Sequence, residues 1–168
     1  MTCNSDDCRS NPRIMAASSF LSENTVFHDF PASINEWPSV SRFFSEWAGK
    51  NECPDSCALL MEMALEELFT NTASYGYPEK NGFILIILFS DPEKKYLQIT
   101  LADNGIPFNP LKRREPDMTL SVEDMPVGGL GIHMVRKFMD HAEYKRHLGC
   151  NIFTFRKYIP EQEKGDSL

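Results

Sequence analysis

The sequence predicts one domain of the α+β class, and three observations support this prediction. Three stretches repeat apolar residues at helical spacing, and five shorter runs have the alternating or continuous apolar pattern of strands. The length of 168 residues suits one domain with a sizeable core. The hydrophobic content of 42% is ordinary for a globular protein. We therefore expect helices and strands to pack around a common core.

The first part of the chain predicts an arm, a strand and a helix. Residues 1–20 are polar and show little periodicity, so we expect a flexible N-terminal arm. Residues 25–30 alternate well enough for a strand, and Pro31 and Ser33 then begin a helix-entry pattern. Residues 34–47 predict an amphipathic helix, because apolar residues recur every three to four positions: Ile34, Trp37, Val40, Phe43, Phe44 and Trp47.

A second helix is predicted over residues 56–73, and it is apolar on nearly every side. Such a helix should be mostly buried, yet it carries Glu67 and Asn71, which are four residues apart and share one face. A carboxylate and an amide on a mostly buried helix need a partner. The residues alone leave two explanations open: a functional site, or a pair at the rim that bonds to a neighbouring loop.

Two further pairs of strands complete the predicted sheet. The continuous apolar run at residues 83–89 and the run at 96–102 are separated by a polar turn, which predicts a hairpin. Residues 142–147 and 152–158 predict a second pair, joined at Gly149. A continuous apolar run such as 83–89 is typical of a strand that is buried along its length.

The turn at residues 103–108 follows directly on the strand at 96–102. The carboxylate of Asp103 can accept a hydrogen bond from the exocyclic amine of a base. Gly105 lacks a Cβ, so the backbone can approach a planar ring closely. An Asp-Asn-Gly sequence is also common in plain turns, so this stretch becomes a candidate site only together with other motifs.

The polar segment over residues 109–127 has no periodicity and contains three prolines. A loop of this length in a compact domain is often a ligand lid, and a disordered linker is the alternative. The segment runs into the sequence GGLG at residues 128–131, which opens a helical pattern over 132–139. Glycines at a helix N-terminus expose backbone N–H groups at the positive end of the helix dipole. This stretch is therefore a candidate phosphate cradle.

Composition excludes several classes of function. The net charge of −7 argues against binding to a phosphate backbone as the main task. The five cysteines are odd in number and lack the spacing of paired zinc ligands, so we expect reduced thiols and no metal cluster. No stretch approaches the roughly 18–20 apolar residues that span a bilayer. These features predict a cytoplasmic protein that contacts neither nucleic acid nor membrane directly.

Three motifs, in this order, resemble the N, G1 and G2 boxes of the GHKL ATP-binding superfamily: ELFTN at 67–71, DNGIPF at 103–108 and GGLGIHMVRKFMD at 128–140. Within that superfamily, residues 25–158 resemble the small bacterial anti-sigma factor serine/threonine kinases most closely. The resemblance implies a Bergerat-type fold, a two-layer α/β sandwich with a mixed, mostly antiparallel sheet and helices on one face. The domain would span residues 21–159, with 160–168 as a polar tail.

The resemblance also implies roles for individual residues. Glu67 would be the base that orients or deprotonates the attacking hydroxyl, and Asn71 would hold a Mg²⁺ ion that bridges the phosphates. Asp103 would bind the adenine amine of ATP, and Gly105 would pack beside the ring. Phosphoryl transfer depends on charge neutralisation, alignment and a positioned base, which such a set can supply. The phosphates would face Gly128, Gly129, Leu130, Gly131 and Ile132.

Two positions depart from the family pattern. The family often has a His-Ala-Tyr sequence shortly after the metal-binding Asn, and this chain has Tyr75, Gly76 and Tyr77 there. A late-strand Thr that helps to bind adenine is replaced by Cys150 or Asn151. Both departures bear on nucleotide affinity and on kinase activity rather than on the fold. Neither of them removes the base or the metal ligand.

The resemblance implies an ATP-dependent protein serine/threonine kinase. Such a kinase phosphorylates an anti-anti-sigma-like partner, sequesters a sigma factor when free, and can form a homodimer. The alternative is a non-catalytic module of the same fold that binds a partner under the control of nucleotide. The retained Glu67 favours the kinase, since a pure binding module needs no base. A histidine-kinase-like catalytic domain working in trans ranks third, because no helix pair with a phospho-accepting His precedes residue 25.

Overall fold

The computed structural model describes residues 11–78, 81–93, 95–112 and 130–160. The strands are β1 (Thr25–Pro31), β2 (Phe83–Ser90), β3 (Tyr96–Asp103), β4 (His141–His147) and β5 (Cys150–Tyr158). The α-helices are α1 (Pro12–Ala16), α2 (Trp37–Lys50), α3 (Asp55–Tyr75) and α4 (Leu130–Phe138). Short 3-10 turns occur at Ser18–Phe20, Ile34–Glu36 and Pro110–Lys112.

The five strands form one sheet in the order β1-β2-β3-β5-β4, and every pairing is antiparallel. The predicted hairpin of β2 and β3 is present, with Leu88 opposite Ile99. Strands β4 and β5 form the second hairpin, whose two-residue turn is Leu148-Gly149. Both turn residues have positive φ, of 48° and 78°, which is the backbone of a tight hairpin turn and favours glycine.

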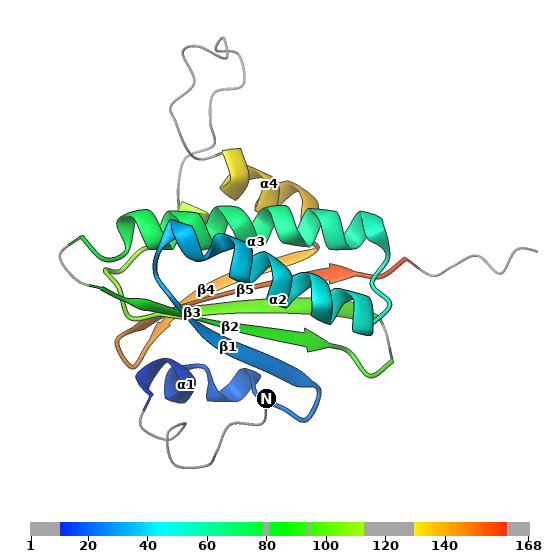
Figure 1. The fold of residues 1–168 in the computed structure, drawn as a ribbon, viewed down its shortest axis with the longest axis horizontal. Coiled ribbons are helices and arrows are strands. Elements are labelled where there is room, and N and C mark those ends of the chain that lie inside the picture. The colour runs from blue at the N-terminus through cyan, green and yellow to red at the C-terminus, as the bar shows by residue number, and fades with distance from the viewer. Residues whose placement is uncertain (1–10, 79–80, 94, 113–129, 161–168) are drawn as a thin grey trace, which may run out of the picture.

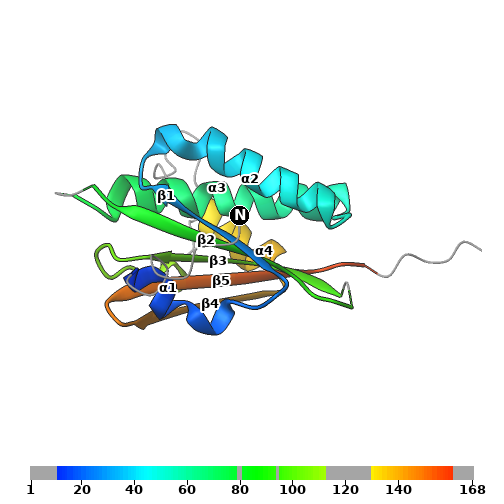
Figure 2. The same cartoon turned by 60° about the horizontal axis from the view of Figure 1, so that its bottom comes forward.

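Helices α2, α3 and α4 cover one face of the sheet, as Figures 1 and 2 show. The core lies between these helices and the inward side chains of the strands. Helix α3 contributes most from the helix side, because its buried residues lie on more than one face. They are Cys57, Met61, Ala64, Leu65, Leu68 and Phe69. The nearly all-round apolar pattern of this helix therefore reflects its place between α2, α4 and the sheet.

Helix α1 packs on the opposite face of the sheet, and for residues 11–20 this corrects the prediction of a flexible arm over residues 1–20 (Figure 2). Ala16 and Ala17 are buried in a second apolar cluster against the sheet. The strand residues of that cluster are Leu85, Ile87, Ala102, Cys150 and Ile152. The physical reason is that the central strands carry apolar side chains on both faces, and both faces must be covered. Residues 1–10 lie outside the described part of the chain.

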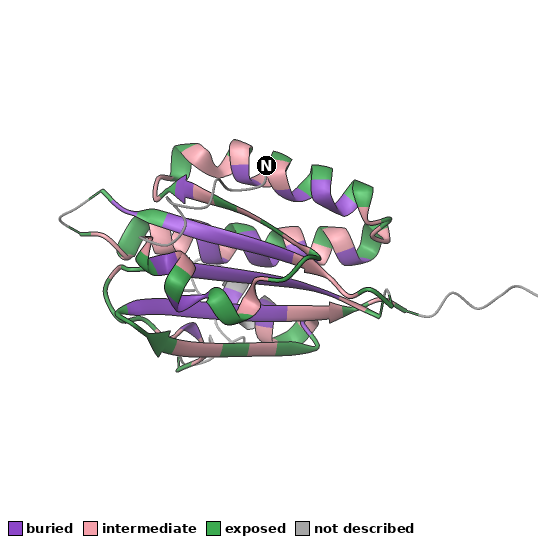
Figure 3. Ribbon diagram, turned by 90° about the horizontal axis from the view of Figure 1, so that it is seen from below, coloured by how far each residue is buried: buried purple, intermediate pink, exposed green. Residues whose placement is uncertain are grey.

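Burial follows the order of the strands, as Figure 3 shows. The central strands β2 and β3 are buried along most of their length, whereas the edge strand β4 is half-buried or exposed throughout. Charged side chains such as Lys145 and Arg146 lie on β4 and discourage pairing with a further strand. The predicted α+β sandwich is confirmed, with α1 as an addition on the second face. The sheet was predicted to be mixed and mostly antiparallel, and the described strands pair only in the antiparallel sense.

Some predictions fall outside the described residues. The predicted lid is described only up to Lys112, and residues 113–127 are not described. The same holds for Gly128, Gly129 and the tail from residue 161. No described helix combines the length and the apolar character that crossing a membrane requires.

Candidate functional site

Asp103 lies at the last position of β3, directly opposite Asn151 on β5. Its neighbours in alternation, Leu101 and Ile99, belong to the core beneath the helices, so Asp103 also faces the helix layer. One carboxylate oxygen, Oδ1, accepts hydrogen bonds from the Gly105 backbone N–H and from Nδ2 of Asn151, each at 2.9 Å. These bonds fix the direction in which the carboxylate points.

The second oxygen of Asp103, Oδ2, accepts no hydrogen bond from any described residue. The side chain is nevertheless buried, at 6% exposure, and it lines a pocket. A buried carboxylate oxygen normally has a donor, so this atom is suited to a donor that arrives with a ligand. Burial raises the pKa of Asp103, and the bonds from Asn151 and Gly105, with the more distant Arg146 and Arg13, oppose this effect.

The raised pKa of Asp103 makes a prediction about stability and pH. A carboxyl whose pKa is higher in the folded than in the unfolded state binds more protons when folded. The free energy of unfolding therefore falls as pH rises from the unfolded-state pKa through the folded-state pKa of this group. Asp103→Asn removes the buried charge and leaves an oxygen that can accept both existing bonds. We expect this variant to be at least as stable as the wild type at pH 7, and the difference to narrow towards pH 4. Urea unfolding of both proteins at pH 7 and pH 4 measures this difference in the free energy of unfolding.

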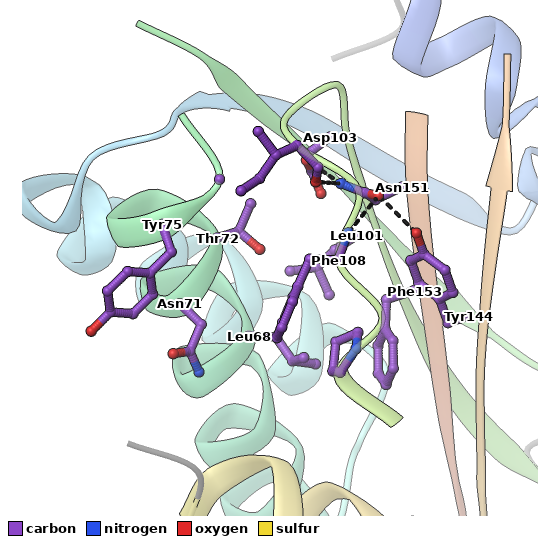
Figure 4. Close-up of a pocket in the computed structure, with 13 residues that line it drawn as sticks. Leu68, Asn71, Thr72, Tyr75, Leu101, Asp103, Phe108, Tyr144, Asn151 and Phe153 are labelled. Carbon is purple, nitrogen blue, oxygen red and sulfur yellow. Dashed lines mark hydrogen bonds between the residues drawn. The ribbon is translucent and has the colours of Figure 1, made fainter. Parts of the chain in front are cut away.

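Asn151 is the centre of the hydrogen-bond network beneath the pocket. Its Oδ1 accepts from the Tyr144 hydroxyl at 2.8 Å and from Nη1 of Arg146 at 2.6 Å. Its Nδ2 donates to the Ile106 carbonyl at 2.9 Å as well as to Asp103. Donors on one side and acceptors on the other permit only this orientation of the amide. The amide therefore holds Asp103 with Oδ2 available to the pocket (Figure 4).

The sequence left Cys150 and Asn151 as alternatives for the position of the family's late-strand Thr. Cys150 faces the other side of the sheet, where it is buried in the cluster beneath α1. Asn151 lines the pocket and bonds to Asp103. Alternation along β5 decides between them, since consecutive residues point to opposite faces. Asn151 is the one that can act at this site.

Gly105 is required by a close approach of backbone to backbone. A Cβ at this position would lie 2.4 Å from the Gly76 carbonyl oxygen and 2.9 Å from Oδ1 of Asp103. The next residue, Ile106, donates its backbone N–H to the same Gly76 carbonyl at 3.0 Å. Gly105 thus lets the turn after β3 lie against the end of α3, and this contact closes one end of the pocket.

A pair of glycine substitutions tests this close contact. We expect Gly105→Ala to destabilise the protein by about 1–3 kcal/mol, the usual range for overpacking. Gly49, in α2, has no atom within 4 Å of an added Cβ, so Gly49→Ala should instead stabilise by about 0.5–1 kcal/mol. Urea unfolding of the two variants should give shifts of opposite sign. A Gly105→Ala protein as stable as the wild type would contradict the contact.

The pocket lies between α3, the turn after β3, and strands β4 and β5 (Figure 4). Its volume is about 170 Å³, and a water molecule needs only roughly 10–15 Å³, so a ring-sized group has room. Most of its lining is apolar, with Leu68, Leu101, Phe108 and Phe153 among the side chains. An apolar pocket with one fixed carboxylate is suited to a flat heterocycle that carries an amine.

Glu67 and Asn71 lie on α3, and the structure brings them together as the sequence predicted. Nδ2 of Asn71 donates to Oε1 of Glu67 at 2.7 Å. Asn71 also lines the pocket, on the wall across from Asp103 (Figure 4). This bond turns Oδ1 of Asn71 away from the carboxylate, and no described residue donates to that oxygen. Amide and carboxylate oxygens are the ligands that Mg²⁺ accepts beside phosphate oxygens.

The described residues contain no group of three or more His, Cys, Asp or Glu that could hold a metal ion. The expected site at Asn71 would not require such a group, because Mg²⁺ is usually bound by one or two protein oxygens together with phosphates and water. A protein cage of acidic residues is not needed for such an ion.

Helix α4 begins at Leu130, within the predicted phosphate-binding stretch. Gly131 and Ile132 belong to its first turn, and Ile132 is buried. The side chain of Ile132 therefore packs in the core, and only its backbone N–H is suited to a phosphate. Gly128 and Gly129 lie outside the described residues, so their predicted role stays a prediction.

Sequence reasoning missed the residues that support the site from behind. Arg146 donates to Asn151 and, at 3.4 Å, to the Gly105 carbonyl, and Tyr144 bonds to Asn151. Both lie on β4, whose mainly polar and charged sequence is typical of an ordinary edge strand. Only the pairing of β4 with β5, which sets Arg146 opposite Asn151, reveals their connection to Asp103.

The two tyrosines at the end of α3 and just after it have separate positions. Tyr75, which replaces the family's His, lines the pocket and is 67% exposed. The Tyr77 hydroxyl donates to the Phe83 carbonyl at 2.8 Å and accepts from the Asn104 backbone N–H at 3.2 Å. Burial and the nearby Asp103 raise the pKa of Tyr77 to about 12. Tyr75 is thus placed to meet a ligand, whereas Tyr77 holds the turn after β3.

A family model described as the histidine kinase-like ATPase domain matches residues 30–157. The chain belongs to the histidine kinase-like ATPase domain family. The match includes Glu67, Asn71, Asp103 and the stretch 128–132, so every residue of the expected site lies within the family domain. Helix α1, which ends at Ala16, lies before the matched range.

Serine-protein kinases from two bacteria are similar to this chain in sequence. Serine-protein kinase RsbW from a strain of Bacillus cereus is 33% identical over 112 residues, which cover 63% of this chain and 68% of the relative. Serine-protein kinase RsbW from Bacillus thuringiensis (strain Al Hakam) is 34% identical over 110 residues, with the same coverage. The chain is therefore a homologue of the RsbW serine-protein kinases.

A solved structure supports the fold assignment. The crystal structure of the RsbU and RsbW domains of a Mycobacterium tuberculosis protein matches with a TM-score of 0.57 and 16% sequence identity. The match covers 81% of this chain and 33% of that one. At this identity the likeness concerns the fold, which both proteins share.

Proposed function

We propose that this protein is an ATP-dependent serine/threonine kinase of the anti-sigma factor type. Its relatives are serine-protein kinases, and the chain belongs to a family of ATPase domains. Asp103 would accept the amine of adenine, Asn71 would face the phosphates, and Glu67 would act as the base. The phosphates would meet backbone N–H groups of residues 128–132.

One observation carries this proposal: Asp103 presents a buried carboxylate oxygen without a described donor to the same pocket that Asn71 lines from α3. A carboxylate accepts hydrogen bonds and donates none, so it selects a donor such as the adenine amine. The base-binding end and the phosphate-binding end would then lie on opposite walls (Figure 4). An arrangement of this kind suits a nucleotide better than a small uncharged ligand.

Mg²⁺ fits the residues present. Oδ1 of Asn71 has no described donor, and its amide is held by Glu67 at 2.7 Å. A bound Mg²⁺ ion would neutralise phosphate charge. The chain's own contribution would be to align the nucleotide and to place Glu67 one helical turn from Asn71, where its carboxylate can take the proton of an attacking hydroxyl.

The proposed protein substrate is an anti-anti-sigma-like protein, and the proposed second partner is a sigma factor. Both follow from the relation to the RsbW kinases. The second candidate function is a partner-binding module whose affinity depends on nucleotide. Tyr75, which stands where the family often has His, is exposed at the rim of the pocket. This departure is the reason to test the binding module alongside the kinase.

Calorimetric titration of the protein with ATP, with and without Mg²⁺, tests the nucleotide site. Binding that requires or is strengthened by Mg²⁺ supports the Asn71 position, and Asn71→Ala should remove that dependence. A transfer assay with γ-labelled ATP and an anti-anti-sigma-type protein then separates the two candidates. Binding without transfer favours the nucleotide-dependent module, and no binding at millimolar ATP would contradict both.

A further inference from the structure

Helix α1 is joined to the sheet by a partly buried cluster of polar groups as well as by Ala16 and Ala17. Arg13 is only 8% exposed, although α1 is a short helix at the surface. Its Nε donates to Oδ1 of Asp29 at 3.0 Å, and Nη2 donates to Oδ2 of the same carboxylate. Asn11, which caps α1 through the Arg13 N–H, also donates to Asp29 at 3.1 Å. The bidentate pairing of Arg13 with the Asp29 carboxylate fixes the guanidinium in one orientation.

The third nitrogen of the Arg13 guanidinium, Nη1, does not bond to Asp29. Nη1 of Arg13 donates to Oδ1 of Asn104 at 3.3 Å. Asn104 directly follows Asp103 and precedes Gly105, so it belongs to the turn that presents the Asp103 carboxylate. Arg13 and Asp103 lie on opposite faces of the sheet, and Asn104 connects them around the end of β3.

Asn104 is held from two sides. Its backbone N–H donates to the Tyr77 hydroxyl, and its side-chain Oδ1 lies 3.1 Å from the same hydroxyl and 3.3 Å from Arg13. The side-chain oxygen is thus the meeting point of α1 and the segment after α3. Removal of the Arg13 donor would leave the Tyr77 hydroxyl as the remaining described partner of this oxygen, and the single proton of that hydroxyl also serves the Phe83 carbonyl.

From these contacts, we propose that Arg13 is a positioning residue for the base-binding turn, and that nucleotide affinity depends on the docking of α1. The affinity part rests on the proposed function. Arg13 does not touch the pocket and acts through Asn104. Helix α1 lies before the range that the family model matches, so this control would be a feature added to the shared domain.

Two single variants and their combination test the proposal. Arg13→Lys keeps a positive charge beside Asp29 but cannot serve Asp29 and Asn104 together. Asn104→Ala removes the whole side-chain amide, including the accepting oxygen, and it leaves both the backbone bond to Tyr77 and the Arg13–Asp29 pair in place. Lys157→Met is the matched control, because Lys157 pairs with Asp140 at the opposite end of β5.

The first measurement is hydrogen exchange without nucleotide. The amides of Gly105 and Ile106 report on the turn directly, since they donate to Asp103 and to Gly76. We expect exchange at these two amides to be about 10-fold faster in both single variants and in the double variant, and unchanged in Lys157→Met. Arg13 would act through Asn104, so the effects of the two substitutions should not add. The exchange rate in the double variant should therefore be no higher than in either single variant.

The second measurement is calorimetric titration of the same proteins with ADP, which undergoes no transfer. We expect the Kd to rise about 5- to 10-fold in each single variant and no further in the double variant, with Lys157→Met at the wild-type value. The proposal would be overturned if exchange at the two amides were unchanged in folded variants. It would also be overturned if the effects of the two single variants multiplied in the double variant, or if exchange became faster while the Kd for ADP stayed the same. A wild type that binds neither ADP nor ATP would refute the proposed function, and the exchange data would still decide whether Arg13 positions the turn.

Discussion

Glu67→Gln should bind ATP as the wild type does but transfer its phosphate about 10²–10⁴-fold more slowly, the range typical of a lost general base. Glutamine keeps an oxygen that can accept the bond from Nδ2 of Asn71, which spans 2.7 Å in the wild type. The geometry of the pair is therefore preserved, while the ability to take a proton is removed. Single-turnover transfer from γ-labelled ATP, beside calorimetric titration, separates chemistry from binding.

The neighbouring residue supplies the control for this prediction. Glu66 lies next to Glu67 on α3 but its side chain is exposed, so Glu66→Gln changes the same charge on the same helix. We expect that variant to retain both binding and transfer. Transfer by Glu67→Gln at the wild-type rate would exclude Glu67 as the base. Equal losses in both variants would point to the net charge of the helix instead.

Asp103→Asn should weaken ATP binding by about 10- to 100-fold, because a hydrogen bond to a charged group contributes roughly 1.5–3 kcal/mol. Asparagine can keep the bonds that Oδ1 accepts from Gly105 and Asn151. Its NH₂ group would then face the pocket. This group and the amine of adenine are both hydrogen-bond donors, so no hydrogen bond could form between them. Calorimetric titration measures the loss, and urea unfolding should show no matching loss of stability.

A carboxylate at the other end of the sheet provides the comparison for Asp103. Asp140 accepts the Tyr158 backbone N–H at 2.7 Å and pairs with Lys157. Asp140→Asn should therefore reduce stability without changing the affinity for ATP. If Asp103→Asn binds ATP with the wild-type Kd, the assignment of the base-binding end is wrong. If it fails to fold, the carboxylate has a structural role that its contacts do not explain.

Local patterns in the sequence predicted most of the framework. The alternation of residues 25–30 and the helical spacing of 34–47 and 56–73 each indicated an element close to its observed bounds. The motifs around Asp103 and Asn71 indicated candidate side chains for a site, and the structure places both residues on one pocket. These features depend on the periodicity and on short motifs, which are properties of neighbouring residues.

The prediction of a flexible arm over residues 1–20 was wrong for the described part, residues 11–20. Polar composition and weak periodicity favour disorder when a segment is considered alone. The apolar run at residues 83–89 contained the contrary information, because a strand that is apolar on both faces needs cover on both. What the sequence did not indicate was which segment supplies that cover, and α1 does so through Ala16, Ala17 and Arg13.

The sequence by itself determined the fold class, most of the elements, and the residues Glu67, Asn71, Asp103 and Gly105 as candidates. The tertiary structure alone decided that Asn151, rather than Cys150, faces the pocket, because strand register sets which face a residue occupies. It also decided which residues support the site, through pairings between β3, β5 and β4 and through the docking of α1. Contacts between residues distant in sequence depend on how the whole chain packs, so no local pattern contains them.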